Sequence, residues 1–184
     1  MKHAILLLAT LSKLAFGAPS NCSVSPEQFN AFIRQDLETF DQKPEGWRSL
    51  VGPMGDHCSF EAAELIDIYH LEHFTPVRPQ GWSQLYWHSG QNYAAAGAAY
   101  YQIAISRFLA SKVPPEQDDP EFKWNPYVDG SVAFLKKDLP TLKAARNQMK
   151  GATKALMNIR VLDRFIKCFN RSYWDAYALI DECS

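Results

Sequence analysis

A shift of 41 residues places one stretch of this chain onto another, and this correspondence constrains the fold more than any other sequence feature. At this shift bulky residues match bulky residues, small residues match small ones, and turn residues match turn residues. The matched pairs are Tyr86 with Tyr127, Gly90 with Ser131, Tyr93 with Phe134, Gly97 with Asp138, Tyr101 with Leu142, Ala104 with Ala145 and Phe108 with Met149. A repeated helical hairpin that buries one face against its neighbours produces such a pattern.

The remaining chain also carries helix signals and lacks the strict two-residue alternation of a half-buried strand. Ser25, Pro26 and Gln28 form a capping box with a first-turn proline, ahead of an apolar stripe from Phe29 to Phe40. Further helices are expected over residues 60–74, 82–96, 98–112, 126–137, 139–150, 153–169 and 172–182. The predicted fold class is therefore all-α, an array of about four antiparallel helical hairpins in one domain over residues 18–184.

The connection over residues 41–57 is long and rich in Gly and Pro. Loops of this length are uncommon unless they are ordered or functional. We expect Trp47 to anchor the loop in the core, with a short helical turn over residues 46–50.

Two segments resemble a known family. Gly90, Tyr93 and Gly97 have the small-residue, aromatic and turn-glycine spacing of the first helix of a tetratricopeptide (TPR) hairpin, and the segment from Tyr173 to Tyr177 is similar to the start of its second helix. The chain resembles the TPR-like superfamily over residues 82–150, although its period is near 41 residues rather than about 34. The resemblance implies a superhelical array of hairpins.

The first 17 residues have the composition of a secretory signal peptide. Lys2 precedes a short apolar run, and the small residues Ala15 and Gly17 predict cleavage after Gly17. The apolar run is far shorter than the ~20 residues needed to cross a bilayer. We therefore predict an exported protein, periplasmic or secreted, without a membrane span.

The charge of the chain is mild. Cleavage after Gly17 would remove Lys2 and Lys13, which changes the formal net charge from −1 to −3. A balance this mild and mixed does not favour binding to nucleic acid or to an anionic membrane surface.

Four cysteines, Cys22, Cys58, Cys168 and Cys183, would remain in the mature chain. An even number in an exported protein predicts two disulfides, and three pairings are open. We disfavour Cys168–Cys183, because a helix over residues 172–182 would separate two Cα atoms that a disulfide holds within ~7 Å.

One face of the helix at residues 82–96 is predicted to line a groove. At about 100° per residue, Trp82, Leu85 and Tyr86 share the core-facing side, whereas Trp87 and His88 point away from it. In a hairpin array such faces line the concave surface. The 41-residue shift adds residues from the helix at 126–137, and the side opposite the first apolar stripe adds residues from the first helix. The predicted binding groove then contains Trp87, His88, Gln91, Asp129, Val132, Lys136, Arg34, Gln35 and Glu38.

The sequence has no local signature of catalysis and suggests no cofactor. It contains no GxSxG elbow and no Gly-rich phosphate loop. His70 and His73 lie one helical turn apart beside Glu72, but no further ligand completes a metal site, so none is expected.

We predict an exported, non-catalytic module that binds another protein, such as an inhibitor or immunity-type protein acting on an envelope enzyme or a toxin. Two alternatives stay open. One is a small secreted hydrolase that uses His88 with Asp129, and the other is a small-molecule carrier with an enclosed apolar cavity.

Overall fold

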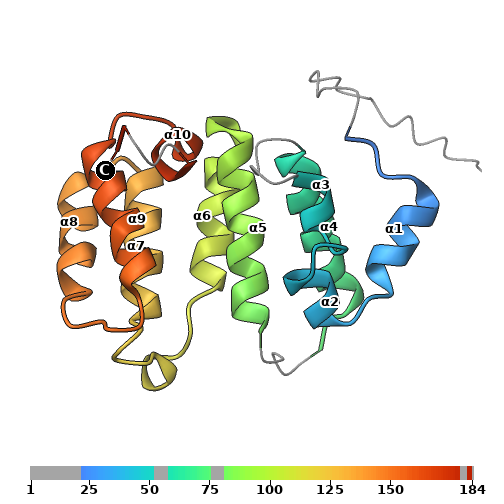
Figure 1. Cartoon of the computed structure of the whole chain (residues 1–184), viewed down its shortest axis with the longest axis horizontal. Coiled ribbons are helices and arrows are strands. Elements are labelled where there is room, and N and C mark those ends of the chain that lie inside the picture. Colours follow the sequence, from blue (N-terminus) through green and yellow to red (C-terminus); the bar gives the residue numbers. More distant parts are fainter. Residues whose placement is uncertain (1–21, 52–57, 76–80, 179–181, 184) are drawn as a thin grey trace, which may run out of the picture.

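The computed structural model describes residues 22–51, 58–75, 81–178 and 182–183. In this part the regular elements are all helical, which confirms the all-α prediction. They are α1 (Pro26–Ile33), α2 (Leu37–Gln42), α3 (Arg48–Val51), α4 (Ser59–Glu72), α5 (Trp82–Ala96), the 3₁₀ turn η1 (Ala98–Tyr100), α6 (Tyr101–Ala110), the 3₁₀ turn η2 (Pro115–Gln117), α7 (Trp124–Leu135), α8 (Leu139–Gln148), α9 (Leu156–Lys167) and α10 (Tyr173–Ala178). They pack as sequential antiparallel pairs in a single body (Figure 1).

Two expectations about membranes and export concern different parts of the chain. None of the described helices combines the length and apolar composition that a membrane span requires. The predicted signal peptide, residues 1–17, lies outside the described residues.

The first predicted helix forms as two helices. The capping box of α1 is present, since the Gln28 backbone N–H donates to Ser25 Oγ (3.2 Å) and the Ser25 N–H donates to Gln28 Oε1 (3.0 Å). Asp36 then begins α2 by accepting a hydrogen bond from the Thr39 N–H at 2.9 Å. An Asp side chain that bonds the backbone in this way competes with helix continuation, so the apolar stripe from Phe29 to Phe40 is divided between two helices.

Trp47 anchors the segment after α2 as predicted, with 4% of its surface exposed. It packs in a cluster with Phe40, Ile66 and Tyr69, which joins α2 and α4. The predicted helical turn is α3, two residues later than expected at its start. Residues 52–57 of this connection lie outside the described part of the chain.

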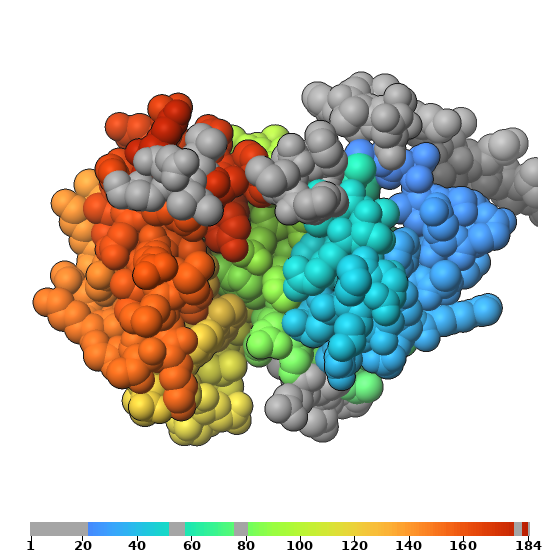
Figure 2. Space-filling model, viewed as in Figure 1, coloured from blue at the N-terminus to red at the C-terminus, as the bar shows by residue number. Residues whose placement is uncertain are grey.

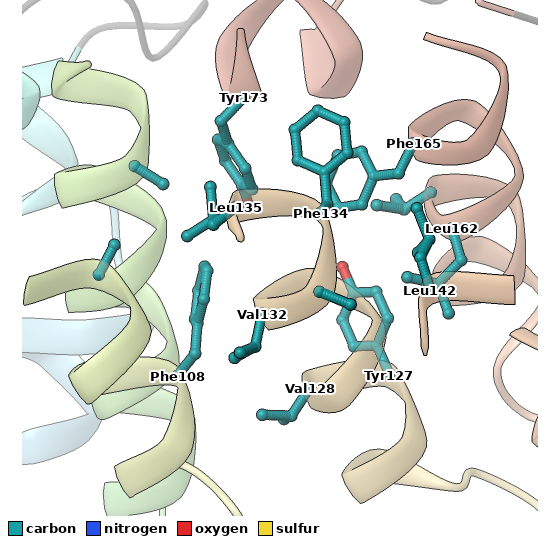
Figure 3. Packing of buried hydrophobic residues seen from close by; sticks show 14 of the residues in the cluster. Phe108, Tyr127, Val128, Val132, Phe134, Leu135, Leu142, Leu162, Phe165 and Tyr173 are labelled. Carbon is teal, nitrogen blue, oxygen red and sulfur yellow. The ribbon is translucent and has the colours of Figure 1, made fainter. Parts of the chain in front are cut away.

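The predicted hairpins α5–α6 and α7–α8 are present. Gly90 lets α5 approach α6 closely, because a Cβ at this position would lie 2.5 Å from Phe108 Cδ1. Gly97, with φ of 121°, ends α5 in a conformation that other residues rarely adopt. The larger core cluster fills the space around these hairpins and includes Phe108, Phe134, Phe165 and Tyr173 (Figure 3).

Two disulfides join Cys22 to Cys58 and Cys168 to Cys183, with Cα atoms 5.2 and 5.7 Å apart. The expectation that disfavoured Cys168–Cys183 is therefore wrong. It assumed that a helix over residues 172–182 would hold the two cysteines apart, but their Cα atoms lie 5.7 Å apart, within the ~7 Å that a disulfide allows.

His70 is a buried imidazole, 6% exposed, that stacks on Tyr86 with ring centres 3.9 Å apart. Burial disfavours the charged ring and lowers the pKa of His70 to about 4. Below the ordinary pKa of about 6.5 the unfolded chain takes up a proton that the folded chain refuses, so stability falls as the pH falls from 6.5 towards 4.

We expect the free energy of unfolding to drop by about 2 kcal/mol between pH 8 and pH 5 through His70 alone. A His70→Phe variant keeps a flat ring against Tyr86 and should lose this part of the pH dependence. Urea unfolding of both proteins at several pH values measures it. Equal slopes between pH 4 and 6.5 for the variant and the parent would contradict the assignment.

Candidate functional site

A groove crosses the middle of the molecule. Figure 2 shows α5, in green, set back between the C-terminal helices, in orange and red, and the segment of α2 and α3, in cyan. A cavity of about 260 Å³ lies among α2, α5, α7, α9 and α10 and is open to solvent. Its lining residues are Gln42, Gln84, Trp87, His88, Gln91, Trp124, Tyr127, Asn158 and Tyr177.

Helix α5 supplies most of this lining because it is central. It packs against α4, α6 and α10, so more than one side of the helix is covered. Trp87 is 5% exposed, and its ring centre lies 4.3 Å from that of Phe108 and 5.0 Å from that of Trp124. The prediction that Trp87 points away from the core is therefore wrong, although one edge of this large side chain borders the cavity.

The His88 ring forms a hydrogen bond with the buried carboxylate of Asp41. Its Nδ1 lies 2.6 Å from Asp41 Oδ1, and Asp41 also accepts a hydrogen bond from Trp47 Nε1 at 3.0 Å. Burial by itself would raise the pKa of Asp41, but the hydrogen bond and charge interaction with His88 and the bond from Trp47 lower it overall. Asp41 is therefore an ionised carboxylate although it is only 2% exposed.

The partners of His88 fix the orientation of its ring. The Asp41 carboxylate only accepts, so His88 Nδ1 carries a proton and donates to it. On the other side of the ring, Arg48 Nη2 lies 3.4 Å from Nε2. These two contacts hold the imidazole at the edge of the cavity.

The structure brings together three of the nine predicted groove residues, namely Trp87, His88 and Gln91. Asp129 does not meet His88, because its two oxygens accept from Lys112 Nζ at 2.8 and 2.9 Å. Val132 is 7% exposed, lies on the side of α7 that faces Phe108 and does not line the cavity (Figure 3).

The other four predicted residues do not line the cavity. Lys136 is exposed at the end of α7, and Arg34 is exposed at the end of α1. Gln35 donates from Nε2 to the Glu45 carbonyl oxygen at 3.1 Å, and Glu38 forms an exposed ion pair with Lys43. Whether any of the nine residues contacts a partner stays a prediction.

Sequence reasoning missed six of the lining residues and the pairing of His88 with Asp41. The lining residues missed are Gln42, Gln84, Trp124, Tyr127, Asn158 and Tyr177. Asp41 and His88 are 47 positions apart, and no local pattern links them. The 41-residue shift marked Tyr127 as a structural position, which is correct, but gave no sign that it borders a cavity.

The candidate metal ligands of the sequence have other roles. His70 stacks on Tyr86, and His73 Nε2 lies 2.7 Å from the Ile33 carbonyl oxygen. In the described chain a group with metal-type ligand atoms close together is formed by Cys22, Cys58 and Glu61. The two sulfurs of this group are joined in a disulfide, so they are not the thiolates that bind metals.

Comparison of this chain with protein-family models, with curated proteins and with solved structures finds no match. The function is therefore inferred from the residues of the chain and their geometry.

Proposed function

We propose that this protein binds another protein without catalysing a reaction, and that the groove around the 260 Å³ cavity is the binding site. The observation that carries the proposal is the composition of the lining, which combines four aromatic rings and four side-chain amides with an immobilised imidazole. Aromatic residues in well-packed pockets dominate the energetics of interfaces. Rigid, preformed groups also lose little conformational entropy when a partner binds.

The same geometry argues against the hydrolase alternative. A general base needs a lone pair that can take up a proton, and the nitrogen of His88 that does not face Asp41 has the Arg48 cation 3.4 Å away, which disfavours protonation there. Asp129, the expected acid, is paired with Lys112. None of the nine lining residues has a carboxylate, thiol, amine or aliphatic hydroxyl group that could act as a nucleophile beside the imidazole.

The carrier alternative requires an enclosed apolar cavity. This cavity is open, and its lining includes the amides of Gln42, Gln84, Gln91 and Asn158. Such a site suits a polar group presented from outside rather than an apolar molecule enclosed within the fold.

Export and a TPR-like ancestry belong to the proposal as well. Both disulfides would persist in an oxidising compartment such as the periplasm or the extracellular space. The hairpins α5–α6 and α7–α8 bury equivalent residues, including Phe108 with Met149 and Ala104 with Ala145, as repeats of one ancestral hairpin would. An inhibitor or immunity-type role towards an envelope or toxin partner fits a stable binding module of this kind.

The test is quantitative retention of a partner from an envelope or extracellular extract of the producing organism. A Gln84→Ala/Gln91→Ala variant removes two amides from the lining of the groove. We expect its affinity to fall about tenfold or more, which is the effect of losing contacts worth at least 1.4 kcal/mol. The matched control is Gln102→Ala, which removes an exposed amide from α6, outside the cavity.

The control variant should retain the partner as well as the parent does. Equal retention by the groove variant would contradict the assignment of the groove. If neither the parent nor the control retains a protein, the protein-binding function itself is wrong.

A further inference from the structure

The nine lining residues include no Asp, Glu, Lys or Arg, which restricts the ligand that the cavity selects. Asp41 and Arg48 lie behind His88, and Arg48 is committed to the Asp41 carbonyl oxygen at 2.9 Å and to the Trp47 ring at 4.4 Å. Arg164 lies over the Tyr177 ring, 5.9 Å from its centre, and does not line the cavity either. A charged ligand would lose its hydration without gaining a counter-charge in the lining, so a neutral ligand is favoured.

Gln42 Nε2 donates to Asp41 Oδ2, so the amides that face a ligand are those of Gln84, Gln91 and Asn158, and they match a particular kind of polar group. A side-chain amide offers two N–H donors and a carbonyl acceptor. A hydroxyl group also donates and accepts, so it pairs with both ends of an amide. The backbone carbonyls of an extended proline-rich peptide only accept, so they would pair with the N–H groups of Gln84 and Gln91 but not with their amide oxygens.

The aromatic rings border the cavity beside these amides, and one face of Tyr177 is stacked on Tyr173 with ring centres 5.6 Å apart. Trp124 and Tyr177 are half-buried and come from α7 and α10, while Trp87 from α5 is buried between α6 and α7. The face of an aromatic ring is electron-rich and attracts the slightly positive hydrogens of C–H groups. A ligand with C–H groups on its flat faces and hydroxyl groups around its edge meets both requirements.

The size of the cavity fits one ring of such a ligand. Its volume of about 260 Å³ is just below the range of about 300–1,000 Å³ typical of sites for drug-sized molecules. An extended peptide of several residues would exceed this volume.

We propose that the cavity binds a neutral saccharide unit, with Gln84 and Gln91 bonding its hydroxyl groups and Tyr177 packing against its C–H face. This inference rests on the proposed function, because the saccharide is then the glycan of the partner protein that the groove recognises.

A glycan array tests the inference with the full chain, both disulfides intact. The probes are neutral oligosaccharides that end in mannose, galactose, glucose or N-acetylhexosamine, their sialylated and sulfated counterparts, and a polyproline peptide. We expect binding to neutral glycans, followed by calorimetry with the neutral glycan that gives the strongest signal. Preference for the acidic glycans or for the peptide would overturn the inference.

Three variants show whether the cavity is the site of this binding. Tyr177→Ala should weaken the neutral glycan at least tenfold, whereas Tyr177→Phe, which keeps the ring, should bind within about twofold of the parent. Gln102→Ala should bind like the parent. Equal affinity for Tyr177→Ala, with the variant shown to be folded by circular dichroism, would place the glycan elsewhere and overturn the proposal.

The two proposals fail in different ways. If the partner protein is retained equally after enzymatic removal of its glycans, and retention still depends on Gln84 and Gln91, the saccharide is wrong and the protein-binding groove stands. If neutral glycans bind in the cavity and the extract yields no protein, the saccharide site stands and the proposed protein partner is wrong.

Discussion

Replacing Phe108 with Ala should lower the free energy of unfolding by about 3–5 kcal/mol, the largest effect expected of a single substitution in this chain. Phe108 has no exposed surface and lies where α5, α6 and α7 meet. Its ring stacks on Trp87 at 4.3 Å and fills the space that Gly90 leaves open. The void left by the substitution is surrounded by helices that cannot close over it without shifting α5.

Urea unfolding followed by circular dichroism measures this loss. The control is Ile103→Ala on the same helix, where 41% of the side chain is exposed and the expected loss is about 0.5–1 kcal/mol. Because Phe108 stacks on Trp87, the Phe108→Ala variant should also change the tryptophan fluorescence. A loss no larger than that of the control would mean that α6 does not pack on α5 as described.

Removing the Cys22–Cys58 disulfide should lower the free energy of unfolding by about 3–4 kcal/mol. The bond spans 36 residues and ties the segment before α1 to Cys58, the N-cap residue of α4. Without it the unfolded chain gains the conformational freedom of a long open loop, while the folded chain keeps its other contacts. A Cys22→Ser/Cys58→Ser variant, unfolded in urea beside the parent protein, measures the difference.

The second disulfide is the internal control. Cys168 and Cys183 are 15 residues apart, so loop entropy predicts that their removal costs about 0.8 kcal/mol less than removal of Cys22–Cys58. A larger loss for the Cys168→Ser/Cys183→Ser variant would contradict a purely entropic role. It would show that the segment after α10 depends on this bond for its packing.

Sequence patterns were sufficient for the helices and the hairpins because the interactions that specify them are local. Ser25 and Gln28 cap α1 across three residues, and Gly97 ends α5 at one position. The 41-residue correspondence of apolar and small residues was enough to predict that α5–α6 and α7–α8 pair as hairpins. Trp47 was correctly placed in the core because a large apolar side chain in a long loop is rarely left exposed.

The orientation of α5 could not be derived in the same way. A helical wheel identifies an apolar face, but it does not count the neighbours that cover the helix. Since α4, α6 and α10 all pack on α5, Trp87 is buried on a side that the wheel assigned to solvent. The Cys168–Cys183 bond is a second case, because helix signals in the sequence do not show how close two distant Cα atoms lie in the folded chain.

The sequence by itself therefore determined the class of fold, the positions of most helices and the presence of His88 and Gln91 beside one another on α5. Only the tertiary structure decided what surrounds them. Asp41 reaches His88 across 47 residues of sequence, and the cavity is lined from five helices. The physical reason is that short-range hydrogen bonds and periodicity specify a helix, whereas a site between helices depends on burial and charge pairing among residues that are far apart in the chain.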